Sequence, residues 1–143
     1  MLVTQKCQYA LRAVLALAKH NGRGPIKIAQ IAEEQAIPFR FLEVILSQLK
    51  QGGFVESRRG TEGGYMMARK PSNISVGDVV EFIDGPIHQV EGGPWGPIGK
   101  DGLAEVWTQA GTALLNVLHG ISFADLKARE ESLSNRFAPN YQI

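Results

Sequence analysis

The chain of 143 residues contains a single cysteine, Cys7, which excludes an intramolecular disulfide and favours a reducing, cytoplasmic setting. The sequence shows no secretory leader pattern, and no apolar run approaches the ~20 residues that a membrane span needs. Its three histidines, His20, His88 and His119, lie in separate segments without metal-ligand spacing. No pair of carboxylates stands out either, so we do not expect an enzyme.

The small net charge of +1 hides a strong difference between the two halves of the chain. Residues 1–70 carry eleven Lys and Arg against five Glu, a net charge of +6. Residues 71–143 carry four Lys and Arg against nine acidic residues, a net charge of −5. A basic half commonly meets a polyanion, most often nucleic acid. Composition alone leaves ordinary solvating charge as an equal alternative.

Apolar residues recur at helical spacing in three consecutive segments. The pattern predicts helices over residues 5–20, 26–35 and 38–51, with Thr4 capping the first. The break between Gln35 and Pro38 has the length of a helix-turn-helix link, although the glycine often found in such a turn is absent. The stripe of the third helix predicted to be buried comprises Phe41, Leu42, Ile45, Leu46 and Leu49.

A β-hairpin is predicted directly after these helices. Residues 54–58 and 64–68 have the pattern of short strands, and a glycine-bearing loop joins them. The fold class is therefore mostly α with a small β-hairpin wing, a winged helix-turn-helix. A wing tip lies over the flanking DNA backbone, where Arg58 and Arg59 can bind phosphate or probe a narrow minor groove. Its glycines allow close backbone approach, although by themselves they equally well just build a turn.

The exposed side of the third predicted helix is the expected DNA-reading surface, because this helix enters the major groove in helix-turn-helix proteins. Arg40 suits guanine O6 and N7, and Glu43 suits cytosine N4. Alternatively, Arg40 is solvated and Glu43 complements the helix dipole. The complete set of predicted DNA contacts is Thr4, Lys6, Tyr9, Phe39, Arg40, Glu43, Ser47, Arg58, Arg59, Gly60 and Gly63.

The second half of the chain follows the winged domain, which we place at residues 1–84. Ser75 and Asp78 have capping-box spacing before a short helix, and residues 85–102 form a Gly/Pro-rich loop. A long helix and a short helix capped by Ser122 and Asp125 are expected over residues 103–126. A tail over residues 127–143 follows, which we expect to be poorly ordered after Ser132.

The long helix carries an apolar stripe that another surface must bury. A helix of ~19 residues spans roughly 28 Å, too long to bury its whole stripe on a compact three-helix core. Pairing with a second copy would bury the stripe and give a homodimer, whereas folding back onto its own domain is the alternative. The stripe consists of Leu103, Val106, Trp107, Ala110, Leu114, Val117 and Leu118.

These blocks resemble the IscR-type regulators, the Rrf-two family, over about residues 1–126. The resemblance is carried by LVTQKCQYALRAVLALA, by the helix-turn-helix, by the RG-x-x-GGY wing, by ISVGDVVEFIDG and by ISFADL. It implies a dimeric winged-helix transcription regulator that binds an inverted-repeat operator in double-stranded DNA, and we expect a repressor. It carries DNA contact to Arg40, Glu43 and Arg59, and dimerisation to residues 103–118. At Phe41 cluster-binding relatives often have a tyrosine.

The chain departs from the cluster-binding members of that family in the loop before the long helix. Those members carry three cysteines there, whereas residues 85–102 contain none. Because cluster ligation generally needs thiolates, we expect no iron–sulfur cluster and predict no cofactor. The effector, a small molecule or a protein, is not identified. Cys7 as a redox thiol and His88 as a titrating or metal-binding group are weak candidates.

A winged-helix adaptor that binds protein instead of DNA is the alternative function. The two wing arginines distinguish the hypotheses, because a DNA-binding protein needs them for affinity and an adaptor does not.

Overall fold

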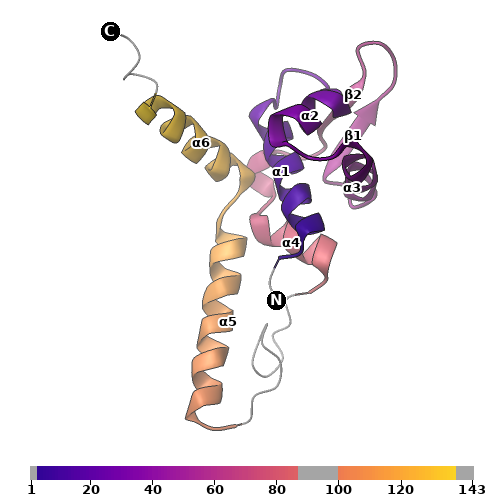
Figure 1. The fold of residues 1–143 in the computed structure, drawn as a ribbon. Coiled ribbons are helices and arrows are strands. Elements are labelled where there is room, and N and C mark those ends of the chain that lie inside the picture. Colours follow the sequence, from indigo (N-terminus) through magenta and orange to yellow (C-terminus); the bar gives the residue numbers. More distant parts are fainter. Residues whose placement is uncertain (1–2, 87–99, 138–143) are drawn as a thin grey trace.

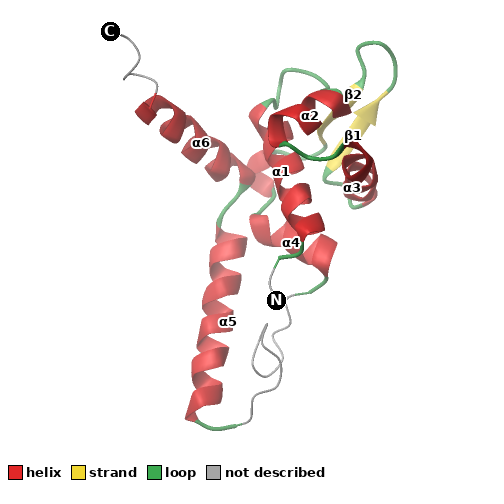
Figure 2. Ribbon diagram, in the orientation of Figure 1, coloured by secondary structure: helices red, strands yellow, loops and turns green. Residues whose placement is uncertain are grey.

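The computed structural model describes residues 3–86 and 100–137, and it shows a mainly helical chain with one small β-hairpin (Figures 1 and 2). This architecture confirms the predicted fold class. The described elements, in chain order, are α1 (Gln5–Lys19), α2 (Ile28–Gln35), α3 (Phe39–Gln51), β1 (Val55–Arg58), β2 (Gly64–Met67), the short 3-10 helix η1 (Pro71–Asn73), α4 (Val76–Asp84), α5 (Gly102–Gly120) and α6 (Phe123–Phe137).

The first three helices form the helix-turn-helix. Thr4 caps α1, and its Oγ1 accepts a hydrogen bond from the backbone N–H of Cys7 at 3.1 Å. The turn between α2 and α3 holds Ala36 in the left-handed region, with φ 54°. An alanine thus adopts the conformation that a glycine often supplies in this turn. Helix α3 begins at Phe39, and Pro38 is its N-cap residue rather than its first helical residue.

The hairpin lies beside α3 as a wing. Its strands pair antiparallel from Val55 opposite Met67 to Arg58 opposite Gly64. The Lys50 ammonium donates a hydrogen bond of 2.7 Å to the Ser57 hydroxyl, which joins the end of α3 to β1. This bond adds to the packing of the wing against α3.

Helices α4 and α5 follow the wing. Ser75 and Asp78 form the predicted capping box of α4. Helix α5 begins after Asp101, whose carboxylate accepts from the Ala104 N–H at 3.0 Å. Residues 87–99 of the predicted loop, which include His88, lie outside the described residues.

Helix α6 is longer than predicted. Its N-terminus is capped by Ser122 and Asp125, as expected, but the helix runs to Phe137 instead of ending near residue 126. The predicted tail from residue 127 is therefore wrong as far as Phe137. The segment from Lys127 to Glu131 is rich in Lys, Ala, Arg and Glu, which favour helix even without an apolar face to bury.

The core contains side chains of α1, α2, α3, the hairpin, α4 and the start of α6, and α5 extends away from it. Leu17, Leu46, Val79 and Phe123 are among the completely or almost completely buried core side chains. In Figure 1, α5 extends away from this body and α6 diverges from it in another direction. In the described part of the chain, no helix is both long and apolar enough to cross a membrane.

Candidate nucleic-acid interface

Helix α3 has a buried inner face and an exposed outer face, which carries both polar and apolar side chains. Its inner face packs into the core through Leu42, Ile45, Leu46 and Leu49, which are at most 2% exposed. Because the helix repeats every 3.6 residues, the residues between these positions face outward. The predicted contact residues Phe39, Arg40, Glu43 and Ser47 are accordingly all exposed. The structure thus brings the predicted reading residues together on one helix.

The prediction for Phe41 was wrong. Its side chain is 59% exposed rather than buried. Phe41 lies at the edge of the buried stripe, and its ring stacks beside that of Tyr9, with centroids 6.4 Å apart and planes at 27°. The aromatic side chain therefore joins the outer surface of α3 to that of α1.

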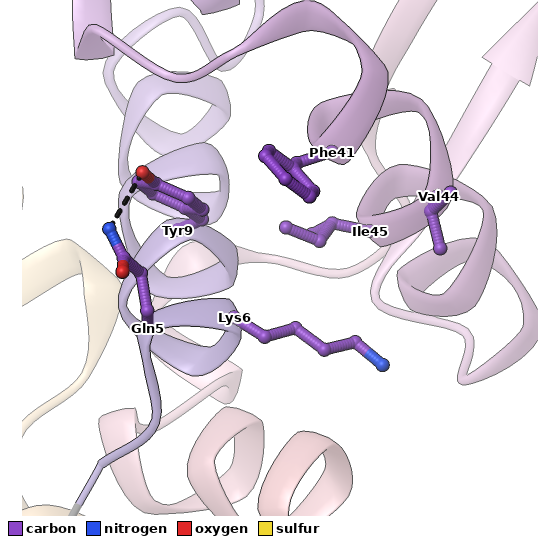
Figure 3. A pocket seen from close by; sticks show the side chains of 6 residues that line it. All are labelled: Gln5, Lys6, Tyr9, Phe41, Val44 and Ile45. Carbon is purple, nitrogen blue, oxygen red and sulfur yellow. Dashed lines mark hydrogen bonds between the residues drawn. The ribbon is translucent and has the colours of Figure 1, made fainter.

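An open cavity of about 530 Å³ lies between α1 and α3 (Figure 3). The Gln5 side-chain amide donates a hydrogen bond of 2.8 Å to the Tyr9 hydroxyl at its edge. Because the Tyr9 oxygen is the acceptor there, its own proton remains available for a phosphate oxygen. The cavity is lined by Gln5, Lys6, Tyr9, Phe41, Val44 and Ile45.

Two predicted contacts, Lys6 and Tyr9, therefore lie next to the reading helix. Sequence reasoning missed Gln5 and Val44 as members of this site. Their spacing held a signal, because Gln5 precedes Tyr9 by four residues and Val44 follows Arg40 by four. Residues four apart on a helix are neighbours on its surface.

Thr4 is hydrogen-bonded to the end of α4. Its hydroxyl donates to Asp84 Oδ1 at 2.6 Å, and its backbone N–H donates to Asp84 Oδ2 at 3.0 Å. The same hydroxyl oxygen caps α1. The side chain of Thr4 thus ties α1 to the end of α4 and does not line the cavity with Lys6 and Tyr9.

The wing tip is a tight turn that needs its glycines. Gly60 has φ 109°, a backbone conformation that residues with a β-carbon rarely adopt. A β-carbon on Gly63 would lie 2.2 Å from the carbonyl oxygen of Arg58. Gly63 is buried in the turn, whereas Arg58, Arg59 and Gly60 are exposed. The tip therefore presents two guanidinium groups on a closely folded backbone.

A third arginine near the wing, Arg69, makes contacts within the fold. The Arg69 Nε donates to the Gly53 carbonyl at 3.2 Å, and the guanidinium lies 4.5 Å from the centroid of the Phe54 ring. This cation–π contact holds the base of the hairpin. Other positive side chains of this surface are Arg58 and Arg59 at the wing tip and Lys6 beside the cavity.

Comparison with known proteins shows the family to which the chain belongs. The Rrf2 family model, described as an iron-dependent transcriptional regulator, matches residues 3–129. The regulator IscR of Sodalis glossinidius is 34% identical over 93% of this chain and 82% of its own length. Protein rrf2 of Nitratidesulfovibrio vulgaris is 33% identical over 98% of this chain and 95% of its own length.

Solved structures agree with these relatives. The structure of CymR, the global cysteine regulator of B. subtilis, matches with a TM-score of 0.81 and 30% identity, covering 90% of this chain and 98% of that one. The winged helix-turn-helix, the exposed face of α3 and the family match along most of the chain lead to one conclusion. The chain belongs to the Rrf2 family and is a DNA-binding transcriptional regulator, not an enzyme.

Proposed function

We propose that this regulator acts in the cytoplasm as a homodimer on an inverted-repeat operator and represses transcription by occupying it. The observation that carries the proposal is the exposure of three residues in the apolar stripe of α5, whose other members are partly buried. Leu103, Val106 and Val117 are 59%, 52% and 56% exposed in the single chain. A contiguous apolar stripe on a projecting helix is typical of a subunit interface, because burying it removes that surface from water.

The base of α5 is well suited to transmit this pairing to the DNA-binding domain. The N–H of Val76 donates to the Ile121 carbonyl at 2.9 Å, and the N–H of Phe123 donates to the Ile74 carbonyl at 3.0 Å. These bonds join the end of α5 to the start of α4. With α5 held at its base, pairing of two α5 helices would hold the two reading helices at a fixed separation.

A fixed separation of reading helices predicts the operator architecture. A twofold-symmetric dimer places its two α3 helices on one face of the duplex, with half-sites one helical turn or a multiple of it apart. Selecting duplexes from a random pool with the purified protein tests this. An inverted repeat with that spacing supports the proposal, and a single unrepeated site contradicts it.

The dimer itself is tested by a charge placed on the stripe. Val106→Asp should convert the dimer to a monomer in sedimentation experiments, because a buried unpaired carboxylate is costly. Thr112→Asp is the matched control, since Thr112 is exposed on α5 about half a helical turn away from the stripe. A Val106→Asp protein that remains dimeric would contradict pairing through this stripe.

We propose further that the chain holds no iron–sulfur cluster. The donor set does not fit one, because clusters are held mainly by cysteine thiolates and Cys7 is the chain's single cysteine. Its side chain is completely buried in α1, and burial with nearby Asp84 raises the pKa of the thiol to about 12. In the part of the chain that the structure describes, no group of three His, Cys, Asp or Glu side chains is arranged to hold a metal ion.

The effector that we propose for this regulator is a small molecule or a protein partner. Protein purified without oxygen should contain neither stoichiometric iron nor sulfide. Finding both, together with cluster absorbance, would overturn this part of the proposal.

A further inference from the structure

The outer face of α3 contains an exposed apolar residue, Val44, beside its polar residues. At 3.6 residues per turn, Arg40, Glu43, Val44 and Ser47 fall within an arc of about 100°. Val44 is 56% exposed, although it lies one turn from Arg40 and adjacent to Glu43. Its isopropyl group has no hydrogen-bonding atom. It therefore cannot pair with a base edge or a phosphate as its polar neighbours can.

Phe41 extends this apolar surface toward α1. Both side chains line the same cavity, and Figure 3 shows Ile45 between them. The Phe41 ring is supported from behind by its stacking on Tyr9. We define Phe41 and Val44 as the apolar patch of the reading helix. Single exposed apolar residues are common on proteins, but this pair occupies the surface that enters the major groove.

Positive charge near the patch favours DNA as its occupant. Lys6 lies beside the cavity on α1, and the exposed Arg58 and Arg59 lie on the wing, whose strand β1 is hydrogen-bonded to the end of α3 through Lys50 and Ser57. Phosphates held by these cations would bring the base edges between them onto the outer face of α3. The apolar patch is thus continuous with the DNA-binding surface of the protein.

Within the major groove, one base offers an apolar group, the 5-methyl group of thymine. We propose that Val44, with Phe41 beside it, contacts thymine methyl groups. Each half-site then contains a thymine that the protein recognises by apolar contact rather than by hydrogen bonds. This inference rests on the proposed recognition of a specific operator. It adds a third kind of base contact to those available to Arg40 and Glu43.

Deoxyuridine isolates the contact, because it differs from thymidine by that methyl group alone. Each thymine of the selected operator is replaced in turn, and affinity is measured at one salt concentration. Losing one buried methyl group, at about 0.8 kcal/mol, should weaken binding by about fourfold at one or two positions in each half-site. Elsewhere in the operator, the replacement should have no effect.

The Val44→Ala variant assigns the effect to this side chain. It should bind the thymine operator more weakly than the wild type and should no longer distinguish thymine from deoxyuridine at the sensitive position. Ser47→Ala, on the same face and one turn away, is the matched control and should keep the distinction. Alanine suits an exposed helical position, so both variants should fold.

Two results would overturn the inference while leaving operator recognition intact. One is sequence-specific binding that no deoxyuridine replacement weakens. The other is a Val44→Ala protein that retains the full fourfold distinction. A protein without any sequence preference would instead contradict the proposed operator recognition, and the thymine contact with it.

Discussion

The backbone of Gly77 in α4 lies directly against the imidazole ring of His119 near the end of α5. A β-carbon on Gly77 would come within 2.7 Å of three ring atoms, which is closer than packed atoms approach. Nδ1 of the same ring lies 3.6 Å from Asp78 Oδ1, and Nε2 contacts the Glu81 carboxylate. The ring of His119 is therefore part of the joint between the long helix and the DNA-binding domain.

Gly77→Ala should damage this joint. Because the added methyl group overlaps the ring, we expect unfolding free energy to fall by about 1–3 kcal/mol in urea denaturation. Gly120→Ala is the matched control, since a β-carbon there meets nothing within 4 Å. In a His119→Ala background the penalty of Gly77→Ala should disappear. An equal penalty in both backgrounds would contradict the contact.

Ala36→Gly should stabilise the protein. Ala36 adopts φ 54° in the turn between α2 and α3, and left-handed backbone costs a residue with a β-carbon roughly 1–2 kcal/mol. Glycine removes that strain but loses more entropy on folding, so we expect a net gain of about 0.5–1 kcal/mol. Urea denaturation measures it. A loss of stability would show that the turn requires the alanine methyl group.

Cys7 should be unreactive in the folded chain. Burial, and then the charge and hydrogen bond of Asp84, raise the pKa of its thiol from 9.0 to about 12, so the thiolate is scarce at neutral pH. Alkylation by iodoacetamide at pH 8 should be slow in buffer and fast in urea. Equal rates in the two solvents would contradict the burial and restore Cys7 as a redox candidate.

The raised pKa of the Cys7 thiol also makes the stability of the fold depend on pH. As pH rises past about 9, the unfolded chain loses the Cys7 proton before the folded chain does. The contribution of the thiol to stability is therefore present at neutral pH and is lost as pH rises toward 12. A Cys7→Ala variant should lack this part of the alkaline decline.

Local patterns in the sequence were sufficient to predict much of the fold. The capping boxes at Ser75 and Ser122 involve residues three apart, and the hairpin follows from its glycines and strand pattern. The turn at Ala36 was placed from its length although its glycine is missing. Caps, hairpins and turns depend on residues that are close together in the chain, so the sequence alone is sufficient to predict them.

Features that depend on distant residues were not predictable. The Thr4 hydroxyl meets Asp84 eighty residues later, and nothing in either segment indicates the pairing. The exposure of Phe41 depends on how α1 and α3 pack against each other, which the helical periodicity of either segment does not reveal. The cavity beside Val44 has the same origin, because residues of two different helices, α1 and α3, line it.

The most direct test of the account is the affinity of an Arg58→Ala/Arg59→Ala protein for the selected operator, measured against salt concentration beside the wild type. If the wing tip contacts phosphates, the double variant should bind more weakly, and its salt slope should fall by about one unit for each lost contact. Unchanged affinity and an unchanged slope would contradict DNA contact at the wing and would favour a protein surface as its target.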